Sequence, residues 1–143
     1  MSNPMIITVC GSMQFHREMV DAENTLEASG FTVYIPSGAY DKSKNEFYAG
    51  SEEEKITFKV ENDLIREHFR NIDQSDAILV LNYEKKGIAG YVGGNTFLEM
   101  GHAFSLGKKI YMLYPVPQMD YSVEMESMLP VVLNGDLSQL PKR

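Results

Sequence analysis

The 143 residues are enough for one domain with a sizeable apolar core. The net charge of −7 argues against a general affinity for nucleic-acid polymers, although backbone N–H groups can still bind the phosphate of a nucleotide. A single cysteine, Cys10, rules out an internal disulfide framework and a zinc site made of cysteines, so we expect no metal and no cofactor. No apolar run reaches the length of a membrane span and no signal-peptide core is present, which predicts a cytoplasmic protein with no membrane partner.

The first 36 residues have the pattern of a strand, a helix and a second strand. Residues 5–10 form a nearly continuous apolar run, typical of a strand covered on both faces, and Cys10 at its end is expected to be a buried structural thiol. Helical spacing then links the apolar residues Phe15, Met19, Ala22 and Leu26. Residues 31–35 are the second strand, which Pro36 stops. Such a unit has parallel strands, and its first turn, Gly11, Ser12 and Met13, faces the usual ligand crevice.

The middle of the chain is polar and then helical. Residues 37–50 predict a surface loop or a lid, whose aromatic residues either contact a flat ligand or fix the loop to the body; they are Tyr40, Phe47 and Tyr48. Ser51 and Glu54 form a capping-box signature, so a helix should begin there. Its apolar face contains Ile56, Val60, Leu64 and Phe69. His68 falls close to this face, so it is either a hydrogen-bonded core residue or a catalytic residue.

A glycine-rich segment follows the next predicted strand, residues 77–81, and opens a predicted helix over residues 96–106. Gly93 and Gly94 can bring backbone N–H groups close to a phosphate, or they form a flexible turn with Asn95 as the N-cap. Glu99 is the only acid of this apolar helix, where a carboxylate is costly unless something pairs with it or uses it. A mid-helix glycine, Gly101, predicts a close approach of another backbone.

The remaining polar residues have simpler interpretations. Asp73 and Asp76 precede the third strand, where aspartate usually bonds its own backbone in a turn. Asn82 and Tyr83 leave the carboxyl end of that strand, a favoured place for ligand contacts. Residues 84–86 (Glu-Lys-Lys) are expected to be a solvated loop tip.

Together these segments predict a single domain, residues 1–143, with a three-layer α/β architecture. A fourth strand is expected at residues 109–113, a short acidic helix at 121–128 and an edge strand at 131–133. The expected fold is flavodoxin-like or Rossmann-like, with a five-stranded, mostly parallel sheet in the order 2-1-3-4-5. The switch point between the first and third strands would then bring Gly11 and Ser12 together with the segment from Gly93 to Asn95, and with Glu99 nearby.

From residue 6 to residue 133 the chain resembles the nucleoside 2-deoxyribosyltransferase superfamily, which also contains deoxynucleoside 5′-monophosphate N-glycosidases and pyrimidine nucleotide hydrolases. The resemblance is carried by the turn at Gly11, by residues 75–81 (Ser-Asp-Ala-Ile-Leu-Val-Leu) and by residues 93–101 (Gly-Gly-Asn-Thr-Phe-Leu-Glu-Met-Gly). It implies that Glu99 is the nucleophile that attacks C1′ of the sugar. It also implies that the sugar or phosphate end of the substrate is bound by Gly11, Ser12, Gly93, Gly94, Asn95 and Thr96.

The chain also departs from the family pattern. The family has an aspartate that helps to protonate or bind the leaving base, and counting back from Asp76 places His68 at that position. Histidine can serve as a general acid near neutral pH. Another family aspartate, just before the glycine turn, is absent here, and the loop before Glu99 is longer. Residues 93–99 (Gly-Gly-Asn-Thr-Phe-Leu-Glu) are also similar, more weakly, to the turn of cytokinin-activating phosphoribohydrolases.

Both resemblances imply an enzyme that cleaves or transfers the N-glycosidic bond of a nucleoside or nucleoside 5′-monophosphate, as a hydrolase or a transferase. The expected catalytic residues are Glu99 and His68. The substrate-binding candidates are Gly11, Ser12, Met13, Phe15, Asp76, Asn82, Gly93, Gly94, Asn95 and Thr96. The alternatives are a non-catalytic nucleotide-binding or sensing module and a phosphoribohydrolase. The resemblance implies a homodimer or higher homo-oligomer.

Overall fold

The computed structural model describes residues 3–36, 40–41, 46–47, 52–54, 56 and 63–142, and the side chains of residues 40–41 and 46–47 are outside this description. Its centre is a five-stranded sheet in the order β2-β1-β5-β6-β7, in which every neighbouring pair is parallel. The strands are β1 (Ile6–Gly11), β2 (Thr32–Tyr34), β5 (Ala77–Leu81), β6 (Lys109–Met112) and β7 (Val131–Val132). The predicted sheet order is confirmed.

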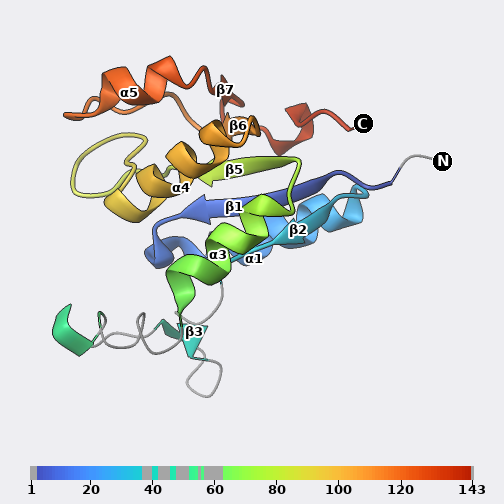
Figure 1. Cartoon of the computed structure of the whole chain (residues 1–143), viewed down its shortest axis with the longest axis horizontal. Helices are drawn as coiled ribbons and strands as arrows, with labels where there is room; N and C mark the ends of the chain where they lie inside the picture. The colour runs from blue at the N-terminus through green and yellow to red at the C-terminus, as the bar shows by residue number, and fades with distance from the viewer. Residues whose placement is uncertain are drawn as a thin grey trace.

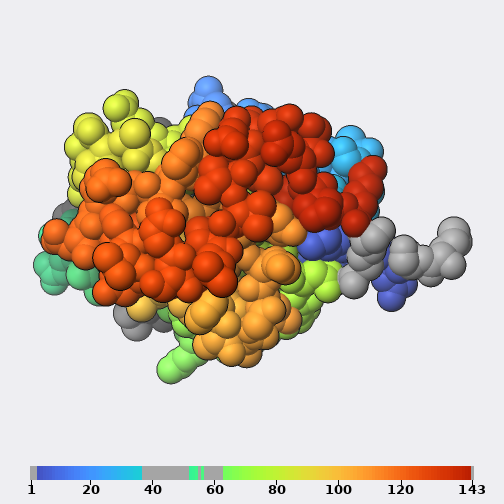
Figure 2. Space-filling view, turned by 90° about the horizontal axis from the view of Figure 1, so that it is seen from above, coloured from blue at the N-terminus to red at the C-terminus, as the bar shows by residue number. Residues whose placement is uncertain are grey.

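Helices cover both faces of the sheet and make three layers (Figure 1). One face is covered by α1 (His16–Ala28) and by the C-terminal segment with the 3-10 turn η2 (Leu137–Gln139). The opposite face is covered by α3 (Leu64–Asp73), α4 (Gly94–Ser105) and α5 (Ser122–Ser127). Figure 2, seen from above in Figure 1, shows that α5 and the C-terminal segment make up much of the surface at the β7 end of the sheet. Among the described residues, no helix has the length and apolar character needed to cross a membrane.

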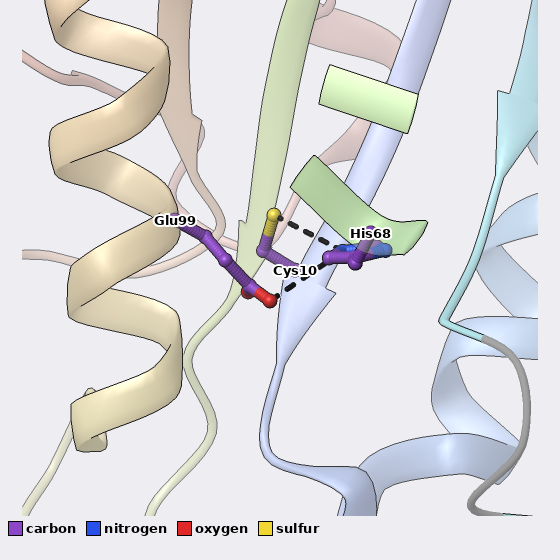
Figure 3. A group of neighbouring side chains, drawn as sticks. All are labelled: Cys10, His68 and Glu99. Carbon is purple, nitrogen blue, oxygen red and sulfur yellow. Dashed lines mark hydrogen bonds and ion pairs between the residues drawn. The ribbon is translucent and has the colours of Figure 1, made fainter. Parts of the chain in front are cut away.

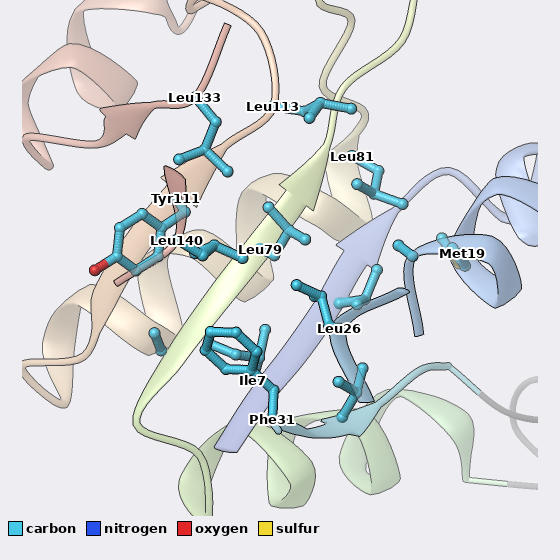
Figure 4. Close-up of a cluster of buried hydrophobic side chains, with 14 residues drawn as sticks. Ile7, Met19, Leu26, Phe31, Leu79, Leu81, Tyr111, Leu113, Leu133 and Leu140 are labelled. Atoms are coloured by element: carbon cyan, nitrogen blue, oxygen red, sulfur yellow. The ribbon is translucent and has the colours of Figure 1, made fainter. Parts of the chain in front are cut away.

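Alternation along the strands divides the core into two clusters. Ile7, Leu79 and Tyr111 point to the face of the sheet covered by α1 and the C-terminal segment, in one cluster with Met19, Leu26 and Leu140 (Figure 4). The neighbouring strand residues face the other way, against the apolar residues of α3, α4 and α5, which include Ile72, Met100, Ala103 and Met125. All five residues of β5 are buried, as the continuous apolar run predicts for a central parallel strand.

The segment between β2 and α3 is only partly described. The predicted loop contains two short antiparallel strands, β3 (Tyr40–Asp41) and β4 (Glu46–Phe47). Ser51, Val60 and Tyr48 lie outside the described residues, so the predicted start of the helix is not tested, although residues 52–54 and 56 are helical.

Two local expectations are wrong. A Cβ atom added to Gly101 would meet no atom of the described residues within 4 Å, so among these residues the glycine marks no close backbone approach. Asp73 and Asp76 bond beyond their own turn: Asp73 Oδ1 lies 2.7 Å from His102 Nε2 of α4, and Asp76 Oδ2 accepts a hydrogen bond from the Ile6 backbone at 2.8 Å. Asp73 joins the end of α3 to α4, and Asp76 joins the segment before β5 to the start of β1.

Candidate functional site

Three chemically active side chains meet near the carboxyl end of β1, and each comes from a different element: Cys10 from β1, His68 from α3 and Glu99 from α4 (Figure 3). His68 Nε2 lies 3.7 Å from Cys10 Sγ and 3.8 Å from Glu99 Oε2. Cys10 is fully buried, while the side chains of His68 and Glu99 are 6% and 13% exposed. Glu99 therefore points into the fold, toward the end of β1.

The local sequence explains why these groups converge. Cys10 follows the alternation of β1 and belongs to the apolar cluster on the α3 and α4 side. His68 lies one helical turn before Ile72, which packs in the same cluster. Glu99 precedes the buried Met100 on a helix that packs against both β1 and β5. Parallel neighbours β1 and β5 end side by side at Gly11 and Leu81, so α3 and α4 bring their side chains to the same sheet edge.

Burial determines the protonation of two members of the cluster. Burial lowers the pKa of His68 to about 4, although the Val9 backbone and the Glu67 carboxylate oppose this shift. Burial, and secondly the negative charge of Glu99, raise the pKa of Cys10 well above its usual value. At pH 7 the cluster therefore contains a neutral imidazole and a neutral thiol. These states argue against a thiolate–imidazolium nucleophile, and against His68 as a general acid at neutral pH, the role that the sequence suggested.

The turn after β1 lies beside this cluster. Gly11 ends β1 and is packed tightly, since an added Cβ would lie 3.0 Å from the Leu81 carbonyl oxygen. Ser12 caps the 3-10 turn η1 (Met13–Phe15), and its Oγ accepts hydrogen bonds from the Gln14 backbone at 3.4 Å and from Lys85 Nζ at 2.9 Å. Lys85 is half-buried, so it belongs to this turn and is not part of the solvated loop tip that the sequence predicted.

The glycine-rich segment forms the start of α4. Gly93 is the N-cap without a side-chain cap, so Asn95 is not the N-cap. Gly94 and Asn95 are exposed, whereas Thr96 is buried. Within the part of the chain that the structure describes, an added Cβ would make only ordinary contacts at Gly93 and none at Gly94, so packing there requires neither glycine. Backbone N–H groups of this first helical turn have no partner within the helix and are suited to an anionic or polar ligand group.

Three of the predicted binding residues serve other contacts in the structure. Asp76 lies at the amino end of β5, about 15–20 Å from the carboxyl edge by the rise of a strand. Phe15 is buried with its ring against Tyr83, at a centroid distance of 5.2 Å. Asn82 is fully buried and is used entirely by the backbone of neighbouring loops. The proposed site therefore does not include these three residues.

Asn82 braces the long loop that leads to α4. Its Nδ2 donates to the carbonyl oxygens of Gly90, Tyr114 and Pro115 at 2.8–3.3 Å, and its Oδ1 accepts from the Tyr114 backbone at 2.9 Å. Gly90 has φ +72°, and a Cβ there would lie 2.6 Å from the Pro115 carbonyl oxygen, so only glycine fits. Nearer to the start of α4, the Tyr121 hydroxyl donates a hydrogen bond to the Val92 carbonyl oxygen. These contacts set the position from which α4 begins.

The structure brings two residues to the candidate site that the sequence did not indicate. Cys10 was interpreted only as a structural thiol, although its place one residue before Gly11 at the end of a predicted strand puts it beside the expected crevice. Lys85 had no comparable signal, because its approach to Ser12 depends on the path of the loop between β5 and α4.

Comparisons with known proteins give distant structural likenesses. No protein-family model matches the chain, and no curated protein sequence matches it significantly. Its structure is similar to that of the CMP N-glycosidase BcmB of Clostridium botulinum, with 16% identity, a TM-score of 0.47, and 89% of this chain and 84% of that chain covered. It is also similar to a 2-deoxyribosyltransferase from Leishmania mexicana, with 17% identity, a TM-score of 0.49, and coverage of 79% and 69%. At these values the likenesses carry no argument about substrate or mechanism.

Proposed function

We propose that this protein cleaves or transfers the N-glycosidic bond of a nucleoside 5′-monophosphate or nucleoside, with Glu99 as the nucleophile. The observation that carries the proposal is the place of the Glu99 carboxylate: 13% exposed, directed inward, and next to Cys10 at the carboxyl end of β1. A solvated Glu99, or one paired far from the Gly11 turn, would have removed its basis. The family resemblance of residues 93–101 supplies the type of bond.

The chemistry suits a partly buried carboxylate. In the proposed step the C1′–N bond breaks and its electron pair leaves with the base, which takes up a proton from water. A bond forms between C1′ and a Glu99 oxygen, because the carboxylate stabilises the positive charge that develops on the sugar. Water, or a second base, then attacks C1′ and frees Glu99, which gives a hydrolase or a transferase.

His68 is assigned a positioning role in this mechanism. Its side chain is 6% exposed and its Nε2 faces the Glu99 carboxylate at 3.8 Å, which is too long for a hydrogen bond but close enough to restrict the carboxylate. The same burial leaves the ring little access to a leaving base.

The turn after β1 supports a phosphorylated substrate. Lys85 Nζ lies beside Ser12 Oγ, and both lie at the end of the strand that carries Cys10. A 5′-phosphate bound at this turn would meet an ammonium group, a hydroxyl and backbone N–H groups, a combination that suits a phosphate dianion. We therefore rank the 5′-monophosphate above the free nucleoside.

The second candidate is a nucleotide-binding module without turnover. The observation that favours it is the burial of His68, which occupies the position of the family's acid and has little access to a base. A carboxylate with no acid to assist the leaving group would bind a nucleotide and cleave it slowly or not at all.

The decisive experiment measures released base by chromatography after incubation with a panel of nucleosides and 5′-monophosphates. We expect release by the wild type and a loss of at least about a hundredfold in Glu99→Gln, which keeps the shape but removes the charge. Glu27→Gln is the matched control, because Glu27 is exposed on α1 across the sheet from the site.

Two outcomes decide between the candidates. Binding of a nucleotide without any release would favour the module. Release that is undiminished in Glu99→Gln would show that another group is the nucleophile. Sugar attached to the peptide that contains Glu99, detected by mass spectrometry of quenched reactions, would support the covalent step directly.

A further inference from the structure

The cluster of Cys10, His68 and Glu99 also contains a set of metal ligands. The Cys10 sulfur, a His68 ring nitrogen and a Glu99 carboxylate oxygen all lie within 4.8 Å of one another. Cys10 and His68 are buried, and Cys10 packs in the apolar cluster that contains Ile72 and Met100. Burying polar groups in an apolar environment is costly unless they pair with one another or bind a ligand.

Two of the three distances between the ligand atoms are close to those expected around a small tetrahedral ion. Zinc–sulfur and zinc–nitrogen bonds of about 2.3 and 2.0 Å imply a separation of about 3.5 Å between sulfur and nitrogen, and about 3.3 Å between nitrogen and oxygen. The observed separations are 3.7 Å for Cys10 Sγ to His68 Nε2 and 3.8 Å for His68 Nε2 to Glu99 Oε2. Glu99 is the least buried of the three, so its side chain is the one that would move to close the remaining difference on metal binding.

The ligand types restrict the metal. Magnesium and calcium take oxygen ligands, whereas thiolate and imidazole together select zinc and its neighbours among the divalent transition metals. Three protein ligands leave a fourth position for water, and the exposed part of Glu99 is the side from which an ion can enter.

We infer that Cys10, His68 and Glu99 bind a single divalent transition-metal ion of the zinc class. On binding, the Cys10 thiol loses its proton to the solvent, and its sulfur, a His68 nitrogen and a Glu99 oxygen each give an electron pair to the ion. The inference has a consequence that rests on the proposed function: a metal on Glu99 occupies the oxygen that would attack C1′. Zinc and substrate then exclude one another, and zinc inhibits the enzyme.

Cobalt(II) is the probe for the site itself, because a thiolate ligand adds a near-ultraviolet charge-transfer band to its spectrum. The full chain, freed of metal with a chelator, is titrated with cobalt(II) and then with zinc. We expect a charge-transfer band that saturates at a single ion per chain and disappears when zinc displaces cobalt. Cys10→Ser should abolish the band, and Glu99→Gln should weaken binding by at least about tenfold.

Asp73→Asn is the matched control. Asp73 and His102 form another histidine–carboxylate pair between α3 and α4, with atoms 2.7 Å apart, but without a sulfur. We expect this variant to bind cobalt as the wild type does. The absence of a charge-transfer band in the wild type, or a loss of binding in Asp73→Asn with Glu99→Gln unchanged, would overturn the inference. Circular dichroism checks the fold of Cys10→Ser, and Glu99→Gln tests the site at a less buried position.

Failure of the metal site and failure of the proposed function are distinguishable. Cobalt binding without any base release would support the metal site and count against the enzyme. Base release that depends on Glu99, without a cobalt band, would support the enzyme and count against the metal site. With both present, zinc should raise the KM for the nucleotide in a way that a chelator reverses, and activity unaffected by saturating zinc would overturn the inferred competition.

Discussion

Replacing Asn82 by alanine should destabilise the protein by about 3 kcal/mol. The side chain is fully buried, and its amide group holds the backbone of two loops: Gly90 before α4, and Tyr114 and Pro115 after β6. Its two N–H groups are shared among three carbonyls and its oxygen accepts one N–H, so about three hydrogen bonds are lost at about 1 kcal/mol each. At about 2.1 cal/mol/K per residue, a chain of this length should lose about 10 °C in Tm.

The assay is thermal and urea unfolding followed by circular dichroism. Asn82→Asp separates hydrogen bonding from packing, because aspartate has nearly the same shape but places a second oxygen against three carbonyls. We expect Asn82→Asp to be at least as destabilising as Asn82→Ala. Asn24→Ala, at an exposed position of α1, is the control and should change Tm little. A near-normal Tm for Asn82→Asp would refute the reasoning, since it would show that the amide only fills space.

Two further predictions concern Lys85 and His16. Lys85→Met should raise the KM for a nucleoside 5′-monophosphate by about tenfold or more, with little effect on the KM for the free nucleoside, because Lys85 lies beside Ser12. The control is Lys86→Met, which removes an exposed ammonium group. Equal effects of the two lysines in steady-state kinetics would contradict a phosphate site at this turn. Burial lowers the pKa of His16, so the unfolded chain takes up a proton near pH 6.5 that the folded chain accepts only at lower pH. The stability that neutral His16 contributes is complete above about pH 6.5 and is lost as the pH falls below that value. The urea midpoint should therefore decline less toward about pH 5 in His16→Gln than in the wild type. Parallel declines of the two proteins would contradict this prediction.

The sequence by itself determined the architecture. Continuous apolar runs predicted buried parallel strands, helical spacing predicted the covering helices, and the order of these segments led to the sheet order that the structure has. These signals are local and strong, because a strand such as β5 that is buried on both faces must be apolar along its whole length. The inward direction of Glu99 was also accessible, since an acid in an apolar helix needs a buried role.

Only the tertiary structure decided which polar groups meet. Asp76 and Asn82 looked like ligand contacts in the sequence, but the fold uses them to tie β1 and two loops together. Cys10 looked structural, and Lys85 looked solvated, but the fold brings them to His68 and Ser12. Such pairings join residues up to 73 positions apart, and they depend on how helices and loops pack, which no local pattern of side chains records.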